Sequence, residues 1–226
     1  MQNNELVIYH GSISVIKCPE FGKGKVYNDY GLGFYCTEDV ELAKEWAVEE
    51  NRDGNANKYV LTLDGLNILD LSKNATVLHW ITVLLQNRVF NLKYDIAKTG
   101  KKFLIENYSL PINKYDIIKG YRADDSYFAY AESFLNNGIT VQQLSKALRL
   151  GNLGEQIVLK SKKAFDNIRF VGYEVADSNI YYPLRFERNM NARKEFLLNR
   201  KITSSIDDLY LSDIMKGIDI NDPRIQ

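Results

Sequence analysis

Apolar residues follow two different periodicities along this chain. Runs rich in β-branched and aromatic residues lie mainly toward the two ends and predict strands at 6–9, 59–63, 67–71, 115–118, 156–159 and 168–173. The middle of the chain has helical spacing, which predicts helices at 75–90, 95–108, 124–136 and 141–150, and a short helix follows at 162–166. Short strands at the ends with helices between them are typical of an α+β fold.

The stretch 13–33 follows neither periodicity and contains several Gly, Lys and Pro residues, so it predicts a long loop. Loops of that length in a compact domain usually carry function. A helix is expected to begin right after Tyr35, because Thr37 can cap its N-terminus and acidic residues follow in the first turn.

The order of elements predicts one domain over 1–188, with a helical insertion at about 75–150, and a helical C-terminal extension over 189–226. The tail is basic in places, which leaves a nucleic-acid-binding regulator as one interpretation. Its basic residues are Arg185, Arg188, Arg193, Lys194, Arg200 and Lys201. The interleaved Glu187 and Glu195 favour a solvated or partner-binding helix instead.

Composition excludes several classes of function. Lys plus Arg and Asp plus Glu both number 29, so no overall positive field attracts nucleic acid. The N-terminus lacks a signal-peptide pattern and no segment has the length and apolarity to cross a membrane, so a cytoplasmic protein without membrane attachment is expected. Two cysteines and two histidines, widely separated, are too few for a zinc site, and no metal is expected.

Candidate chemistry begins where the first predicted strand ends, at His10-Gly11-Ser12. The backbone of Gly11 can approach a flat amide closely, and His10 can hydrogen-bond a hydroxyl, although an isolated histidine is more often simply half-buried. Tyr35 and Trp46 are eleven residues apart, about three helical turns, so they can share a helix face and stack on a flat ring. The same spacing also suits two ordinary core aromatics.

Taken together, these segments resemble a known class of enzymes. Tyr9-His10-Gly11-Ser12, then Gly31-Leu32-Gly33-Phe34-Tyr35 and Asp39, resemble the His-Gly-Ser and Gly-x-Gly-x-Tyr segments of the diphtheria-toxin and poly-ADP-ribose polymerase class of ADP-ribosyltransferases. Nearly the whole chain is similar to a family of uncharacterised bacterial proteins designated domain of unknown function 3990. Its hallmarks here include Ala43-Lys44-x-Trp46-Ala47, Ala123-Asp124-Asp125 and Gln156-Ile157.

The resemblance implies a split antiparallel β-sheet around a cleft that takes NAD as substrate. It implies NAD-binding roles for His10, Gly11, Ser12, Tyr30, Gly33, Tyr35 and Trp46, and it makes Tyr35 a catalytic candidate as the tyrosine of the His-Tyr-Glu signature. By analogy it also implies transfer of one ADP-ribose to a macromolecular acceptor, a toxin or defence role, and a possible cognate antitoxin protein as partner.

The sequence departs from that class at two places. A serine that binds the nicotinamide amide is Ala43 here, and the catalytic glutamate falls at Gln156 or, shifted by one, at Glu155. Neighbouring strand residues point to opposite faces, so only one of the two can enter the cleft. Gln156 is preferred from the family resemblance. Glutamine supplies no negative charge for an oxocarbenium, so a carboxylate at position 156 is expected to raise NAD cleavage.

Two acids, Asp124 and Asp125, are candidates to assist, although acids in a first helical turn are common. The alternative to a transferase is a catalytically silent module that binds NAD, ADP-ribose or a partner protein in the same pocket. NAD binding without nicotinamide release would distinguish the module from the enzyme.

Overall fold

A computed structural model of the chain describes residues 4–122, 125–147, 154–200, 205–219 and 222–225. The strands are β1 (Glu5–Ser12), β2 (Phe34–Cys36), β3 (Gly54–Thr62), β4 (Ile68–Asp70), β5 (Ile117–Tyr121), β6 (Glu155–Leu159) and β7 (Ile168–Ala176). The first helices are α1 (Val40–Ala47), α2 (Leu71–Asn74), α3 (Val77–Asn87), α4 (Asp95–Tyr108), α5 (Asp125–Leu135) and α6 (Val141–Ala147). They are followed by α7 (Lys162–Asp166), α8 (Ser178–Arg200) and α9 (Leu211–Met215), with short 3₁₀ turns η1 (Ile112–Lys114) and η3 (Pro223–Ile225). This content confirms the α+β class.

The strands form two sheets, ordered β1-β3-β7 and β2-β6-β5-β4. Every named pair is antiparallel except β4 with β5, which are parallel. Parallel strands need a long crossover connection, and here α2, α3 and α4 supply it. The sheets meet where Tyr9 and Thr37 exchange two backbone hydrogen bonds, of 2.7 and 2.9 Å. This junction brings the end of β1 beside β2.

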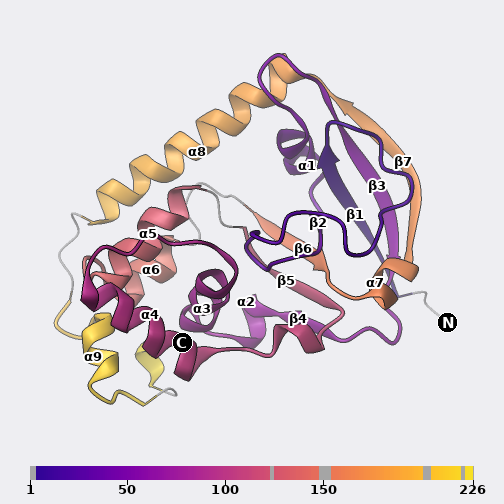
Figure 1. Cartoon of the computed structure of the whole chain (residues 1–226). Helices are drawn as coiled ribbons and strands as arrows, with labels where there is room; N and C mark the ends of the chain where they lie inside the picture. Colours follow the sequence, from indigo (N-terminus) through magenta and orange to yellow (C-terminus); the bar gives the residue numbers. More distant parts are fainter. Residues whose placement is uncertain (1–3, 123–124, 148–153, 201–204, 220–221, 226) are drawn as a thin grey trace.

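Apolar side chains are buried in two main clusters that hold these layers together. The larger cluster lies between the β2-β6-β5-β4 sheet and helices α3 to α6, where Leu78, Leu104 and Phe134 have no exposed surface. The second lies between the two sheets and contains Phe34, Tyr59 and other apolar residues. Figure 1 shows helices α3 to α6 and α9 gathered on one side, the β1-β3-β7 sheet with α1 and α7 on the other, and α8 extending from one side to the other.

The helix α1 begins later than the sequence pattern predicts. Its N-cap is Asp39, whose Oδ1 accepts hydrogen bonds from the backbone N–H groups of Glu41 (2.9 Å) and Leu42 (3.2 Å). Tyr35 lies in β2, where it pairs with Val158 of β6. The expectation that the helix starts right after Tyr35 is therefore wrong, because pairing with β6 extends the backbone as far as Cys36.

The long helix α8 runs without a break through residue 188, so the expected end of the domain falls inside it. Its first half is joined to α1 by Arg188, whose Nε and NH2 donate to the two carboxylate oxygens of Glu45 at 2.9 and 2.7 Å. Its second half packs on the helical side, where the Tyr130 hydroxyl donates to the Ala192 carbonyl oxygen. Arg188 of the basic tail thus serves an internal ion pair.

Candidate functional site

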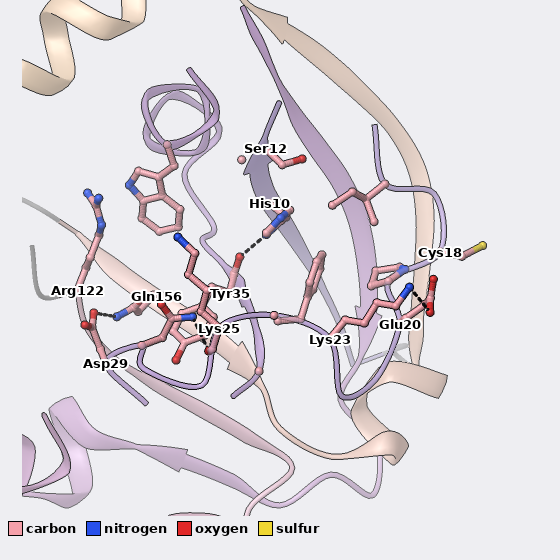
Figure 2. A pocket seen from close by; sticks show the side chains of 18 of the residues that line it. His10, Ser12, Cys18, Glu20, Lys23, Lys25, Asp29, Tyr35, Arg122 and Gln156 are labelled. Carbon is pink, nitrogen blue, oxygen red and sulfur yellow. Dashed lines mark hydrogen bonds and ion pairs between the residues drawn. The ribbon is translucent and has the colours of Figure 1, made fainter. Parts of the chain in front are cut away.

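A cavity of about 730 Å³ opens at the junction of the two sheets. Its wall is formed by the ends of β1 and β2, by β6, by α1 and by the loop 13–33, which contains neither helix nor strand, as expected. Seven of the residues expected at a ligand site line it: His10, Gly11, Ser12, Gly33, Tyr35, Trp46 and Gln156. Figure 2 shows His10, Tyr35 and Gln156 on neighbouring elements around this space.

His10 is held by two contacts. Its Nδ1 lies 2.7 Å from the carbonyl oxygen of Tyr35, and its ring stacks on Phe34 with centroids 4.3 Å apart. Burial lowers the pKa of His10 below its ordinary value, while the hydrogen bond to Tyr35 opposes that change. The neutral ring must then carry its proton on Nδ1 to donate to the carbonyl. Nε2 is consequently a hydrogen-bond acceptor.

Asn57 fixes the end of β1, and the sequence motifs do not point to it. It is fully buried, its Nδ2 lies 3.2 Å from both the His10 carbonyl oxygen and the Ser12 hydroxyl, and its Oδ1 accepts from the Ile16 backbone N–H at 2.8 Å. The predicted strand 59–63 does not reach Asn57, so no signal for it was available before the structure placed this asparagine inside β3. Asn57 therefore ties the His-Gly-Ser segment to the start of the loop 13–33.

Gly11 allows α1 to approach the strand. A Cβ on Gly11 would lie 2.1 Å from the Ala43 carbonyl oxygen and 2.9 Å from the Cβ of Trp46, so no larger residue fits without displacing the helix. This contact sets Trp46 at the cavity wall.

The guanidinium carbon of Arg122 lies 4.9 Å from the centre of the Trp46 ring, and the buried Nε1 of Trp46 has no hydrogen-bond partner among the described residues. Ala43 itself is fully buried and does not line the cavity.

The Tyr35 hydroxyl stabilises the turn that precedes β2. It donates to the Gly31 carbonyl oxygen at 2.5 Å and accepts from the Tyr30 backbone N–H at 3.1 Å. Burial is the main cause that raises the pKa of Tyr35 well above its ordinary value, so the phenol stays protonated. Nζ of Lys160 donates to the carbonyl oxygens of Tyr30 and Leu32. Four hydrogen bonds between the backbone and the side chains of Tyr35 and Lys160 therefore define the conformation of this turn.

Two residues proposed for the site lie elsewhere. The ring of Tyr30 is 1% exposed, and its hydroxyl donates to the Tyr121 carbonyl oxygen inside the larger core cluster. Glu155 faces a different hollow, which Glu38 and Arg188 also line, and it pairs with Lys119 at 3.2 Å. Because Glu155 and Gln156 are neighbours in β6, Gln156 faces the cavity.

Gln156 contacts a carboxylate that none of the sequence motifs contains. Gln156 is 4% exposed, and its Nε2 donates to Asp29 Oδ2 at 2.8 Å and to the Tyr121 carbonyl oxygen at 3.3 Å. Asp29 is also buried, 7% exposed, and lines the same cavity. The sequence signal available for Asp29 is its place immediately before Tyr30-Gly31. Asp124 lies outside the described residues, and Asp125 is described only as the first residue of α5.

Charge at the cavity differs from charge over the whole chain. The described residues that line it include four cations, Lys23, Lys25, Arg88 and Arg122, and two carboxylates, Glu20 and Asp29. Glu20 pairs with Lys23 at 2.6 Å, and Asp29 lies 3.8 Å from Arg88 Nε. The formal surplus of two positive charges suits a ligand that carries two negative charges.

Neither metal-binding clusters nor membrane-crossing helices are found in the described part of the chain. No three or more His, Cys, Asp and Glu side chains there are grouped so that they could hold a metal ion. Among the same residues no helix combines the length and apolarity needed to cross a membrane.

Fold and site together define an α+β protein with a cavity between two sheets, framed by a neutral histidine, two aromatic side chains and a glutamine-carboxylate pair. The model of the family described as protein of unknown function DUF3990 matches residues 6–170. The chain belongs to that family. No curated protein and no solved structure is significantly similar to it.

Proposed function

We propose that this chain binds NAD in the cavity and transfers one ADP-ribose unit to a macromolecule, as ADP-ribosyltransferases do. The observation that carries the proposal is the meeting of His10, Tyr35, Trp46 and Gln156 around one cavity. The resemblance assigns His10, Tyr35 and Trp46 to NAD binding and Gln156 to the place of the catalytic glutamate. The four residues come from four separate parts of the sequence. The volume of about 730 Å³ lies within the range of about 300–1,000 Å³ that is usual for ligand pockets.

Three parts of NAD have chemically suitable partners in the cavity. The nicotinamide ring can stack against Tyr35 or Trp46, and a ribose hydroxyl can donate to Nε2 of His10. The two negative charges of the pyrophosphate match the surplus of two positive charges in the lining. Three apolar side chains of the loop 13–33 are exposed, namely Phe21, Val26 and Tyr27, and they offer a contact surface for a macromolecular acceptor.

Calorimetric titration with NAD tests the binding half of the proposal. Trp46→Ala should weaken NAD binding about 2- to 10-fold, because stacking on a ring contributes roughly 0.5–1.5 kcal/mol beyond area burial. The matched control is Tyr94→Ala, which removes an exposed aromatic side chain that does not line the cavity. Equal affinity of both variants and wild type would contradict the proposed pocket.

A second candidate is a module that binds NAD or ADP-ribose without cleaving it. The observation in its favour is that the strand position facing the cavity carries the neutral Gln156. Incubation with NAD and a bacterial lysate, followed by chromatography of released nicotinamide, separates the two functions. Release and labelling of a macromolecule support the transferase, whereas tight binding with no release supports the module.

A further inference from the structure

We infer that Asp29 is the catalytic carboxylate of this site, and that it supplies from the loop 13–33 the negative charge that Gln156 lacks. The inference rests on the proposed function, because it concerns the same cavity and the cleavage of NAD. The negative charge is then on the turn that precedes β2, and not on strand β6, where the resemblance places a glutamate.

The geometry places the Asp29 carboxylate next to the side chain that takes the place of the glutamate. Asp29 Oδ2 accepts from Gln156 Nε2 at 2.8 Å, and both side chains line the cavity. Figure 2 shows the two side chains meeting on the side of the space opposite Ser12. Gln156 uses its nitrogen for both of its hydrogen bonds, so Oε1 is the atom left to accept from a ribose hydroxyl.

Asp29 is held in position by its surroundings. The following backbone carbonyl, that of Tyr30, accepts from Lys160, and the Gly31 N–H donates to the Asn28 carbonyl oxygen at 2.9 Å. Arg88 Nε is 3.8 Å from Asp29 Oδ1, longer than a hydrogen bond, while its NH1 donates to the Tyr27 carbonyl oxygen. The position of the carboxylate is therefore set before any ligand arrives, which is the condition for electrostatic stabilisation of a transition state.

The charge of Asp29 also acts on the aromatic residues around it. After burial, Asp29 is the next largest cause that raises the pKa of Tyr30, and it also raises the pKa of Tyr35. A charge that disfavours a new anion on those rings favours a new cation in the same space. The ribosyl cation of NAD cleavage is such a cation.

The reaction would proceed by heterolysis of the bond between ribose C1′ and the nicotinamide nitrogen. The electron pair leaves with nicotinamide, which becomes neutral, and the positive charge passes to the ribose, where Asp29 stabilises it. An acceptor nucleophile, or water, then forms the new bond to C1′ and releases its proton to solvent. Neither an oxidant nor a reductant is required.

The test measures nicotinamide release and NAD affinity for Asp29→Asn, which keeps the shape of the side chain and an oxygen to accept from Gln156. Release should fall at least 100-fold while the Kd for NAD changes less than about 3-fold, the pattern of an interaction made mainly in the transition state. The control is Asp95→Asn, in an exposed acid of α4 that does not line the cavity, and its rate should stay within 2-fold of wild type.

The double variant Asp29→Asn with Gln156→Glu exchanges the amide and the carboxylate. It keeps one negative charge and one hydrogen bond between the two positions, so release should recover at least 10-fold over Asp29→Asn. If the single variant does not fold, the double variant carries the test alone: release above a hundredth of the wild-type rate supports the inference, and release below a hundredth in the folded protein overturns it.

Two results separate this inference from the proposed function. If wild type releases nicotinamide and Asp29→Asn does so at more than a third of that rate, Asp29 is not the catalytic carboxylate and the transferase proposal stands. If wild type binds NAD and releases nothing with any lysate, the transferase proposal fails and this inference fails with it. A loss of NAD affinity equal to the loss of rate would also overturn the inference, because it would mean a role in ground-state binding.

Discussion

Replacing Gln156 by glutamate should destabilise the protein in a strongly pH-dependent way. Gln156 is 4% exposed, and its amide nitrogen donates to Asp29 and to the Tyr121 carbonyl oxygen. An ionised glutamate would donate to neither, and it would place a second carboxylate against that of Asp29. A carboxylate at this position alone is therefore not expected to raise NAD cleavage at neutral pH, contrary to what the sequence suggests.

The size of the effect follows from the 2.8 Å contact. Loss of a hydrogen bond to a charged group costs about 1.5–3 kcal/mol. Two unit charges at that distance repel by about 6 kcal/mol at an effective dielectric constant of 20, so the pair should retain a proton instead. The cost then becomes about 1.4 kcal/mol for each pH unit between the pKa of an unfolded glutamate, about 4.3, and the raised pKa of the pair. We expect a loss of about 3–5 kcal/mol at pH 8 and about 1 kcal/mol at pH 5.

The sign of the pH dependence follows from proton binding. The new carboxyl has a higher pKa in the folded than in the unfolded chain, where a glutamate has a pKa of about 4.3. The folded state therefore binds more protons, and the added stability is present below that unfolded pKa and lost as the pH rises through the folded pKa.

Urea unfolding followed by tryptophan fluorescence between pH 4 and pH 8 measures the difference from wild type. Gln156→Met removes the donors without adding charge, and its loss should be nearly independent of pH. The double exchange with Asp29→Asn should recover most of the stability at pH 8. A Gln156→Glu variant with the same loss at pH 5 and pH 8 would refute the contact between positions 29 and 156.

Three further predictions concern the frame of the site. Arg188→Met should lower the free energy of unfolding in urea by about 3–5 kcal/mol, because the Glu45 side chain, 4% exposed, would lose its partner. Replacing both residues by Met should regain most of that stability, and a single variant of wild-type stability would contradict the pairing. Gly11→Ala should cost at least about 1–3 kcal/mol and weaken NAD binding, because its Cβ would meet a backbone oxygen of α1 at 2.1 Å; wild-type stability would refute that packing. Burial lowers the pKa of His10, so the unfolded chain takes up the proton first, and wild-type stability should fall as the pH drops below about 6.5. His10→Gln should flatten this fall in urea titrations at pH 5–7, and His79→Gln, at a half-buried histidine of lowered pKa, is the comparison. An unchanged slope in the His10 variant would count against the neutral state of His10.

Features that depend on neighbouring residues could be predicted from the sequence alone. The helices at 95–108 and 162–166 have the predicted bounds, and the loop 13–33 and the α+β class are as expected. Local periodicity and turn-forming residues are sufficient for these. The His-Gly-Ser and Gly-x-Gly-x-Tyr segments also indicate much of the cavity wall, because the residues of each segment lie close to one another along the chain.

Which residues face the cavity depends instead on tertiary packing. Positions 157–159 of β6 are buried on both faces, so alternation gives no direction for Glu155 or Gln156, and pairing with β2 and β5 sets it instead. The chain after Tyr35 continues as a strand and does not begin a helix for the same reason, since β6 supplies the hydrogen-bond partners of β2. The contact between Asp29 and Gln156 spans 127 positions. No local pattern records such a contact, because it exists only once two sheets and a loop have packed together.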